Sequence, residues 1–247
     1  IAIFGGSHPF HILADTITGW NFSNNYGVEG PTKKRYINKL RKLKWRNSMA
    51  MLFLAQGVPL VWSGDEISNS QQGNNNAYCQ DNPVGWVNWK NEKTHRKEIR
   101  FLEQLAQFRR EHPIVANEMP FQFSDYRSYG SPDLSFHGES AWILEPSEGR
   151  MALGMMYNGA YSTDERYKED VYVAYNFYSA ASTLALPKLD KDKHWYLVMD
   201  TSDDEMPFLE KAVLQDRGNI VLKAQSICVL VGRSEQKEGK RKVKEGK

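Results

Sequence analysis

A polar segment over residues 71–89 carries the side chains best suited to binding chemistry. Its candidate binding residues are four amides, a carboxylate and an indole, namely Asn74, Asn75, Asn76, Gln80, Asp81 and Trp86. Amides and carboxylates exchange hydrogen bonds with sugar hydroxyls, and an indole ring stacks on a pyranose face. Asparagines also stabilise tight turns, and Trp86 and Trp89, three residues apart before a helix, are more typical of packing residues. The segment therefore predicts either a substrate-binding rim or a self-supporting loop.

Two other pairs of polar residues have both a chemical and a structural interpretation. His8 and His11 are spaced like metal ligands, but no third and fourth ligand follow at a supporting spacing, so no metal site is expected. Asp65 and Glu66 form a neighbouring carboxylate pair. For this pair, ion pairs and capping hydrogen bonds that stabilise the loop are favoured over a chemical role.

Apolar runs and amphipathic segments alternate in the first half of the chain. They predict two buried strands and two helices, over residues 1–4, about 32–56, 58–62 and 94–111. Ile37, Met51 and Ala55 belong to the periodic apolar face of the first helix, and Gly57 stands where its C-terminal cap is expected. Strand, strand-connecting helix and strand in this order predict a parallel α/β unit over residues 1–114.

After Pro113 the pattern changes to short alternating and β-branched runs between turns rich in Pro, Gly and Asp. These runs predict strands over residues 141–144, 150–157, 171–177, 195–199 and 220–231. We therefore expect an antiparallel β-sandwich domain over residues 115–233. Residues 234–247 are almost entirely polar and charged, so a disordered tail is expected there.

Composition limits the class of protein. Of the 247 residues, 40% are hydrophobic and 25% charged, as in ordinary soluble domains, and no run of eighteen apolar residues or secretory pattern is present, so no membrane partner is expected. Cys79 and Cys228 are too few for a disulfide scaffold and fit a reducing, cytoplasmic compartment. Residues 33–46 hold eight basic and no acidic residues, but no nucleic-acid-binding motif accompanies them, so no nucleic-acid partner is expected.

Residues 56–89 carry the most specific pattern, QGVPLVWSGDEISNSQQGNNNAYCQDNPVGWVNW. This segment resembles the strand-8 region of glycoside hydrolase family 13, in its glycogen-debranching and isoamylase branch. Other segments are similar to further parts of that branch, at 26–32 (YGVEGPT), 108–113 (FRREHP), 132–138 (PDLSFHG), 174–176, 185–187 and 195–201. The resemblance covers about residues 1–232. It implies strands and helices 7 and 8 of a (β/α)8 barrel, the TIM-type fold, followed by the C-terminal antiparallel β-sandwich domain of the family.

The resemblance also implies an activity, the hydrolysis of α-1,6 branch linkages by two carboxylates with a retaining mechanism and no cofactor. The nucleophile and acid of the family lie on strands 4 and 5, which would precede Ile1, so no catalytic residue is assigned here. His8 matches a family histidine and is a candidate sugar contact, whereas Pro9 stands near a family carboxylate. Either the alignment is locally shifted or the chain is a non-catalytic relative that binds glucan or a partner protein.

Three kinds of partner follow from these hypotheses. A glucan of the glycogen or starch type is the expected substrate. Two barrel strands need neighbours, so we also expect association with an upstream segment, which the start at Ile1 rather than methionine suggests, or self-association. A third hypothesis, nucleic-acid or phosphate binding by the basic helix, predicts binding that weakens steeply with added salt, whereas binding of a neutral glucan hardly responds.

Overall fold

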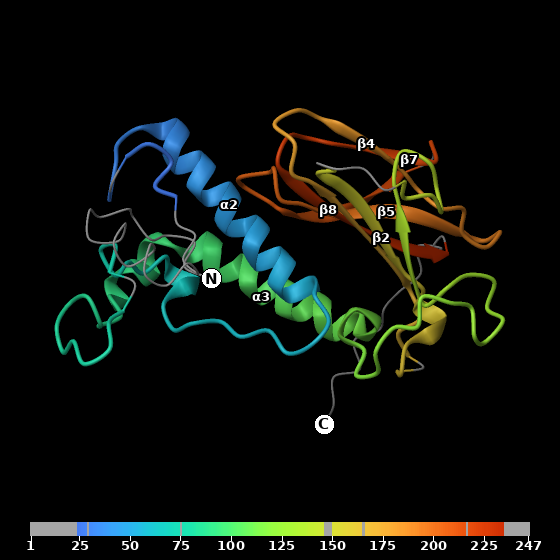
Figure 1. Ribbon diagram of the computed structural model, residues 1–247, viewed down its shortest axis with the longest axis horizontal. Coiled ribbons are helices and arrows are strands. Elements are labelled where there is room, and N and C mark those ends of the chain that lie inside the picture. Colours follow the sequence, from blue (N-terminus) through green and yellow to red (C-terminus); the bar gives the residue numbers. More distant parts are fainter. Residues whose placement is uncertain are drawn as a thin grey trace, which may run out of the picture.

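The computed structural model describes residues 24–28, 30–74, 76–145, 150–164, 166–215 and 217–234. Two long helices, α2 (Arg35–Leu54) and α3 (Arg96–Glu111), pack together and against a β-sheet (Figure 1). Four short 3₁₀ turns complete the helical part, at η1 (Asp65–Ile67), η2 (Trp89–Thr94), η3 (Pro113–Ala116) and η4 (Gly159–Tyr161). The predicted strand over residues 1–4 and the tail over 235–247 lie outside the described residues. No described helix is both long enough and apolar enough to cross a membrane.

The second half of the chain forms two antiparallel sheets. The large sheet has the strand order β1-β2-β3-β8-β5-β6, and the small sheet pairs β4 with β7. The strands are β1 (Leu134–His137), β2 (Ala152–Tyr157), β3 (Asp170–Asn176), β4 (Ser182–Ala185), β5 (Lys193–Asp200), β6 (Phe208–Gln215), β7 (Asn219–Leu222) and β8 (Ser226–Ser234). The prediction of an antiparallel β half with two packed sheets is therefore confirmed.

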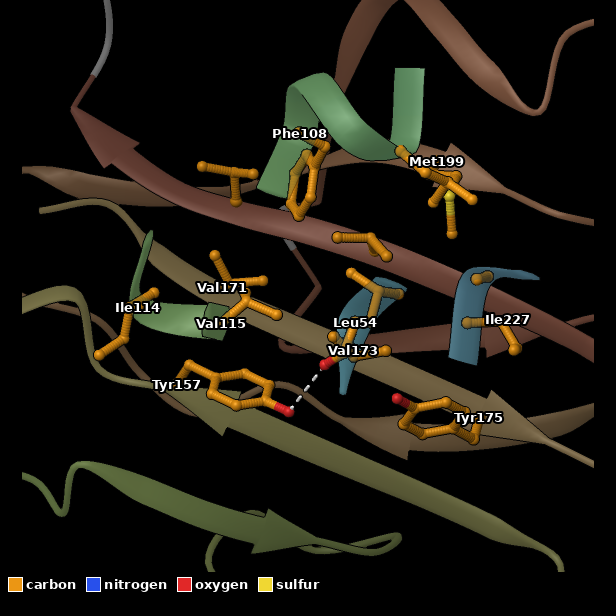
Figure 2. Close-up of a cluster of buried hydrophobic side chains, with 14 of the residues drawn as sticks. Leu54, Phe108, Ile114, Val115, Tyr157, Val171, Val173, Tyr175, Met199 and Ile227 are labelled. Atoms are coloured by element: carbon orange, nitrogen blue, oxygen red, sulfur yellow. Dashed lines mark hydrogen bonds between the residues drawn. The ribbon is translucent and has the colours of Figure 1, made fainter. Parts of the chain in front are cut away.

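The central strands of the large sheet are buried on both faces. Along β3, Val171, Val173 and Tyr175 point toward the helices, whereas Tyr172 and Ala174 point toward the small sheet. This alternation follows from the two-residue period of a strand. Figure 2 shows the helix-facing side, where α2 and α3 lie over β3 and the neighbouring strands. The large sheet is thus the middle layer between the helices and the small sheet.

The strand predicted over residues 58–62 does not form. Val58, Leu60 and Trp62 lie in irregular backbone and are 95%, 84% and 71% exposed. A parallel strand is stable when neighbouring strands bind its N–H and C=O groups and other elements cover its faces. Among the described residues no strand pairs with this segment, and every described strand pair is antiparallel. The predicted parallel pairing is therefore absent from the described part of the chain.

Several predicted boundaries also change. Residues 141–144 contribute only an isolated bridge between Ser140 and Ile143, and the run over 220–231 is split into β7 and β8 by a turn in which Gln225 has φ 53°. Ser234, predicted to begin the tail, is the last residue of β8. The strands β1, β4 and β6 were not predicted, because their short or largely exposed sequences lack a clear alternation.

Helix α2 ends without the glycine cap that the sequence predicts. Its cap residue is Ala55 in extended backbone, and Gly57, with φ 97°, lies two residues further on. The guanidinium of Arg109 on α3 binds the final carbonyls instead, at 2.7 Å from both the Phe53 and Ala55 oxygens, and it also donates to the Gly57 carbonyl. Arg109 therefore supplies the partners that helix carbonyls lack at a C-terminus.

A buried polar network joins α2 to the large sheet. The Thr201 hydroxyl, fully buried just after β5, donates to Asn47 Oδ1 at 2.6 Å and accepts the Ile227 N–H of β8 at 2.9 Å. Asn47 Nδ2 in turn donates to the Gln225 carbonyl at 2.7 Å, and Arg46 Nε donates to the Thr201 carbonyl at 2.9 Å. These bonds fix one position of the helix on the sheet.

His137 makes folding stability depend on pH. The side chain is fully buried in β1, its Nδ1 accepts the Trp142 N–H at 2.8 Å, and burial lowers its pKa from 6.5 to about 4. The histidine of the unfolded chain takes up a proton near pH 6.5, whereas the buried histidine of the folded chain stays neutral until about pH 4. The contribution of His137 to the free energy of unfolding is therefore complete above pH 6.5 and is lost as pH falls toward 4. We expect the free energy of unfolding to fall by about 2 kcal/mol between pH 7 and pH 5 through this group.

Urea unfolding of the wild type and of His137→Gln across this pH range measures that effect. Glutamine keeps a neutral hydrogen-bond acceptor and donor but does not titrate. The decrease in the free energy of unfolding between pH 7 and pH 5 should therefore be about 2 kcal/mol smaller in the variant than in the wild type. Identical pH profiles for the two proteins would contradict a neutral buried histidine.

Candidate functional site

An open cleft of about 1080 Å³ lies between the N-terminal half of α2, the loop before it, and the segment over residues 68–95. Its polar lining is dominated by amides, hydroxyls and a few charges. The lining residues used below are Asn38, Arg41, Lys42, Asn69, Trp86, Asn88, Asn91, His95 and Glu98. In Figure 1 this region lies at the end of the two helices, on the side away from β1.

Arg41 builds the wall that precedes α2. Its guanidinium donates to three carbonyls of the loop, those of Gly30 at 2.7 Å, Asn25 at 2.9 Å and Val28 at 2.5 Å. The loop needs such support because Tyr26 has φ 55° and the glycines beside it also adopt left-handed backbone. The described residues of the YGVEGPT motif therefore form a loop that is folded around one arginine of the basic helix.

Other cations of the basic segment are engaged within the chain as well. Lys39 and Arg46 pair with Asp204, at 3.3 and 2.5 Å, and Lys42 pairs with Glu98 at 3.0 Å. Together with Arg41, four of the eight basic residues of segment 33–46 hold other parts of the chain. Contacts with the loop, the sheet and α3 thus account for these four charges, so a nucleic acid or another anionic polymer is not needed to explain them.

Asn69 organises the opposite wall. Its Oδ1 accepts the Asn88 N–H at 3.0 Å, and its backbone N–H donates to the Gly64 carbonyl at 2.9 Å. Gly64 has φ 100°, and a Cβ there would lie 2.7 Å from the Asn69 Cβ, so only glycine fits. The bond between Asn69 and Asn88 thereby holds the two ends of the polar segment close together at the cleft.

Among the predicted site residues that the structure describes, Trp86 is the one that lines the cleft. The ring is 54% exposed, and its Nε1 donates to Asp81 Oδ1 at 2.9 Å, which fixes the orientation of the indole. Trp89 is 63% exposed, so the prediction that the two tryptophans are packing residues is wrong. A half-exposed indole held by a carboxylate is a suitable stacking surface for a pyranose ring.

The described amide side chains of the predicted rim form hydrogen bonds within their own loop and do not line the cleft. Asn74 Nδ2 donates to Gln80 Oε1 at 3.2 Å, Gln80 Nε2 donates to the Asn76 carbonyl at 2.8 Å, and Asn76 Oδ1 accepts the Tyr78 N–H at 3.1 Å. Such bonds are typical of asparagine-rich turns. A role of these residues in substrate binding stays a prediction, and His8 and Asn75 lie outside the described residues.

The carboxylates near this site have structural partners. Asp65 Oδ2 accepts the Trp62 N–H at 3.3 Å and Glu66 Oε2 accepts the Gly64 N–H at 2.9 Å, as the capping role predicts, although no ion pair involves either among the described residues. Burial raises the pKa of Asp65. Glu98 is the one carboxylate among the described lining residues, and it pairs with Lys42. The described lining can therefore bind hydroxyls but does not hold the two carboxylates that glycoside hydrolysis requires.

Several lining residues were not anticipated from the sequence. Asn91 of η2, His95 between η2 and α3, and Glu98 in the first turn of α3 all line the cleft. Their spacing of four and then three residues is the spacing of neighbours on one helical face. That periodicity is the only sequence signal, because Asn38 and Asn69 come from unrelated segments. Within the described ranges no cluster of three or more His, Cys, Asp or Glu side chains could hold a metal ion.

Known proteins resemble this chain both in sequence and in fold. No family model matches the chain. It is 32% identical over 184 residues to isoamylase 1 of Arabidopsis thaliana, covering 74% of this chain and 22% of that protein, and 31% identical over 211 residues to a glycogen debranching enzyme of Serratia proteamaculans, covering 85% and 28%. The chain therefore spans about a quarter of the length of these curated relatives.

Solved structures agree in fold. A type I pullulanase from Bacillus subtilis in complex with maltose matches with a TM-score of 0.58 at 19% identity, over 77% of this chain and 23% of that one. A pullulanase from Anoxybacillus in complex with maltotetraose matches with a TM-score of 0.55 at 17% identity, over 81% and 24%. By sequence, the chain is a relative of the isoamylases and glycogen debranching enzymes, the branch of glycoside hydrolase family 13 that its motifs resemble.

Proposed function

We propose that this chain forms the closing part of a (β/α)8 barrel and the following β-sandwich domain of an α-glucan debranching hydrolase. The observation that carries the proposal is the exposed apolar run over residues 58–62, which stands between two amphipathic helices inside the most specific motif. Exposed Val58, Leu60 and Trp62 are unfavourable in water unless neighbouring strands cover them. The relatives are three to five times longer than their matched parts, which leaves room for such strands.

This chain and the remaining strands of the barrel contribute different parts of the site. Other barrel strands supply the nucleophile and the acid, because the described cleft holds only the paired Glu98. This chain contributes a cleft wall with polar and aromatic side chains at the N-terminal ends of the helices, the face where barrel enzymes place their sites. An upstream segment is the favoured partner of residues 58–62, and self-association is the alternative.

Sedimentation and dye binding test the partner requirement. The 247-residue chain alone should sediment as an oligomer or bind a hydrophobic dye, because residues 58–62 remain uncovered. A sharp monomer without dye binding would show that these residues are covered within the chain and would contradict the proposed barrel neighbour.

Trp86 should carry a measurable share of the glucan affinity. We expect Trp86→Ala to weaken binding of a linear maltooligosaccharide about tenfold, because the variant loses the stacked indole. Calorimetric titration of both proteins measures the two dissociation constants. Trp89→Ala is the matched control, since Trp89 is 63% exposed against 54% for Trp86 but does not line the cleft. Equal losses in both variants would argue against a specific role for Trp86.

A non-catalytic glucan-binding relative is the second candidate function. Pro9 stands near the position where the family carries a transition-state carboxylate, and proline offers no charge there. Release of reducing ends from a branched glucan by the protein isolated from its native cell separates the two candidates. Hydrolysis of branch linkages supports the first function, whereas glucan binding without hydrolysis supports the second.

A further inference from the structure

Three tyrosines gather where the loop before β1 meets η4. The Tyr126 and Tyr129 rings lie against the Tyr161 ring, with centroid separations of 4.9 and 5.0 Å. Tyr161 is buried, whereas Tyr126 and Tyr129 are 44% and 45% exposed. The guanidinium of Arg127 lies 5.6 Å from the Tyr126 ring and 6.0 Å from the Tyr161 ring. We call these four residues the tyrosine platform.

Asp125 holds the platform in place. Its carboxylate accepts the Tyr161 hydroxyl at 2.5 Å and the N–H groups of Tyr129 and Gly130 at 2.8 and 2.9 Å. These donors, the Tyr161 hydroxyl foremost, keep the pKa of Asp125 below its usual value, while burial and the same bond raise the pKa of Tyr161 to about 12. The hydrogen bond therefore persists with a charged Asp125 and a neutral Tyr161. Asp125 thus holds the Tyr129 backbone and the Tyr161 ring, against which both exposed rings lie.

The chemistry of the exposed groups matches a carbohydrate. Residues 125–131, DYRSYGS, expose phenol rings, a guanidinium and hydroxyls, and they contain no aliphatic side chain. Aromatic rings stack on the C–H face of a pyranose, and guanidinium and phenol groups bind its hydroxyls. Fixed aromatic groups also lose little conformational entropy on binding.

We propose that the tyrosine platform is a second α-glucan-binding surface of this chain, a proposal that rests on the proposed function. In Figure 1 the loop before β1 and the segment over residues 68–95 lie at opposite ends of the molecule. A short oligosaccharide occupies one of the two surfaces, whereas a branched polymer can contact both. Binding at two linked positions raises the apparent affinity for the polymer. The platform thus increases retention on glycogen-like particles.

Electrophoresis through gels that contain glycogen tests the proposal with the 247-residue chain. The double variant Tyr126→Ala/Tyr129→Ala should show about tenfold weaker retardation by glycogen than the wild type, because both stacking rings are lost. Tyr126→Phe/Tyr129→Phe keeps the rings and should retain most of the affinity. Tyr36→Ala is the matched control, since Tyr36 is an exposed tyrosine of α2 outside the platform and the cleft.

The outcomes separate this inference from the proposed function. Retardation of the wild type and equal retardation of the double alanine variant would overturn the platform while leaving glucan binding intact. No retardation of the wild type would overturn the proposed function and the platform with it. The single variants Tyr126→Ser and Tyr129→Ser, checked by thermal unfolding, replace the double variant if it does not fold, and unchanged retardation of both folded single variants would again overturn the platform.

Discussion

Thr201→Val is expected to lower the free energy of unfolding by about 4 kcal/mol. Valine has nearly the shape of threonine, so the change removes hydrogen bonds without leaving a cavity. In the variant, two buried groups lose their hydrogen-bond partner: Asn47 Oδ1 and the Ile227 N–H, which lie 2.6 and 2.9 Å from the hydroxyl in the wild type. Each unsatisfied buried group destabilises the folded state by about 1–3 kcal/mol. Urea unfolding followed by circular dichroism measures the difference.

Thr183→Val provides the matched control for this prediction. Thr183 lies exposed on β4, where water satisfies the hydroxyl, so the same substitution should change stability by less than about 0.5 kcal/mol. If the two variants lose the same amount of stability, the polar network does not anchor α2 on the sheet.

Arg109→Ala is expected to destabilise the chain by about 3 kcal/mol. The variant leaves the carbonyls of Phe53, Ala55 and Gly57 without the guanidinium that binds them, at the end of a helix that lacks a glycine cap. Hydrogen bonds to a charged donor are stronger than neutral ones, and the helix dipole adds to the attraction. The loss should appear as a lower midpoint in urea unfolding.

Arg110→Ala separates the capping role from the charge. Arg110 is the next residue of α3, has the same charge and is exposed, so its loss should cost less than about 1 kcal/mol. Exchange of the α2 amides with solvent should also accelerate in Arg109→Ala more than in Arg110→Ala. An equal effect of both variants on stability and exchange would contradict the cap.

The β half could be predicted from the sequence because local alternation determines it. Strands β2, β3 and β8 bury apolar residues, and β-branched residues mark β3 and β8. Strand 58–62 could not be judged in the same way, since a parallel strand exists only through its neighbours. For α2, Met51 and Ala55 have the predicted period but are exposed, whereas Trp45 and Leu54 are buried because the sheet and α3 select that face.

The candidate site could be predicted only in its outline. A binding role of the polar segment stays a prediction. Its Trp86 does line the cleft, and this residue could be singled out because an aromatic residue in a polar loop is conspicuous in the sequence. Whether an asparagine of the polar segment binds a neighbouring residue or faces the cleft depends on which groups lie within hydrogen-bond distance of it. The residue types alone do not determine these distances. Arg41 and Asn69 reach partners across several segments, so only the folded chain shows that they build the two walls.

The central claim is that this chain completes a debranching barrel with strands from a longer polypeptide. The most direct measurement is the intact mass of the protein in its native cell, combined with an assay for α-1,6 branch hydrolysis on the same fraction. We expect a mass well above 28.4 kDa and hydrolysis that requires an aspartate and a glutamate at the strand ends of the additional segment. A mass near 28.4 kDa, with glucan binding but no hydrolysis and no associated chain, would contradict the claim.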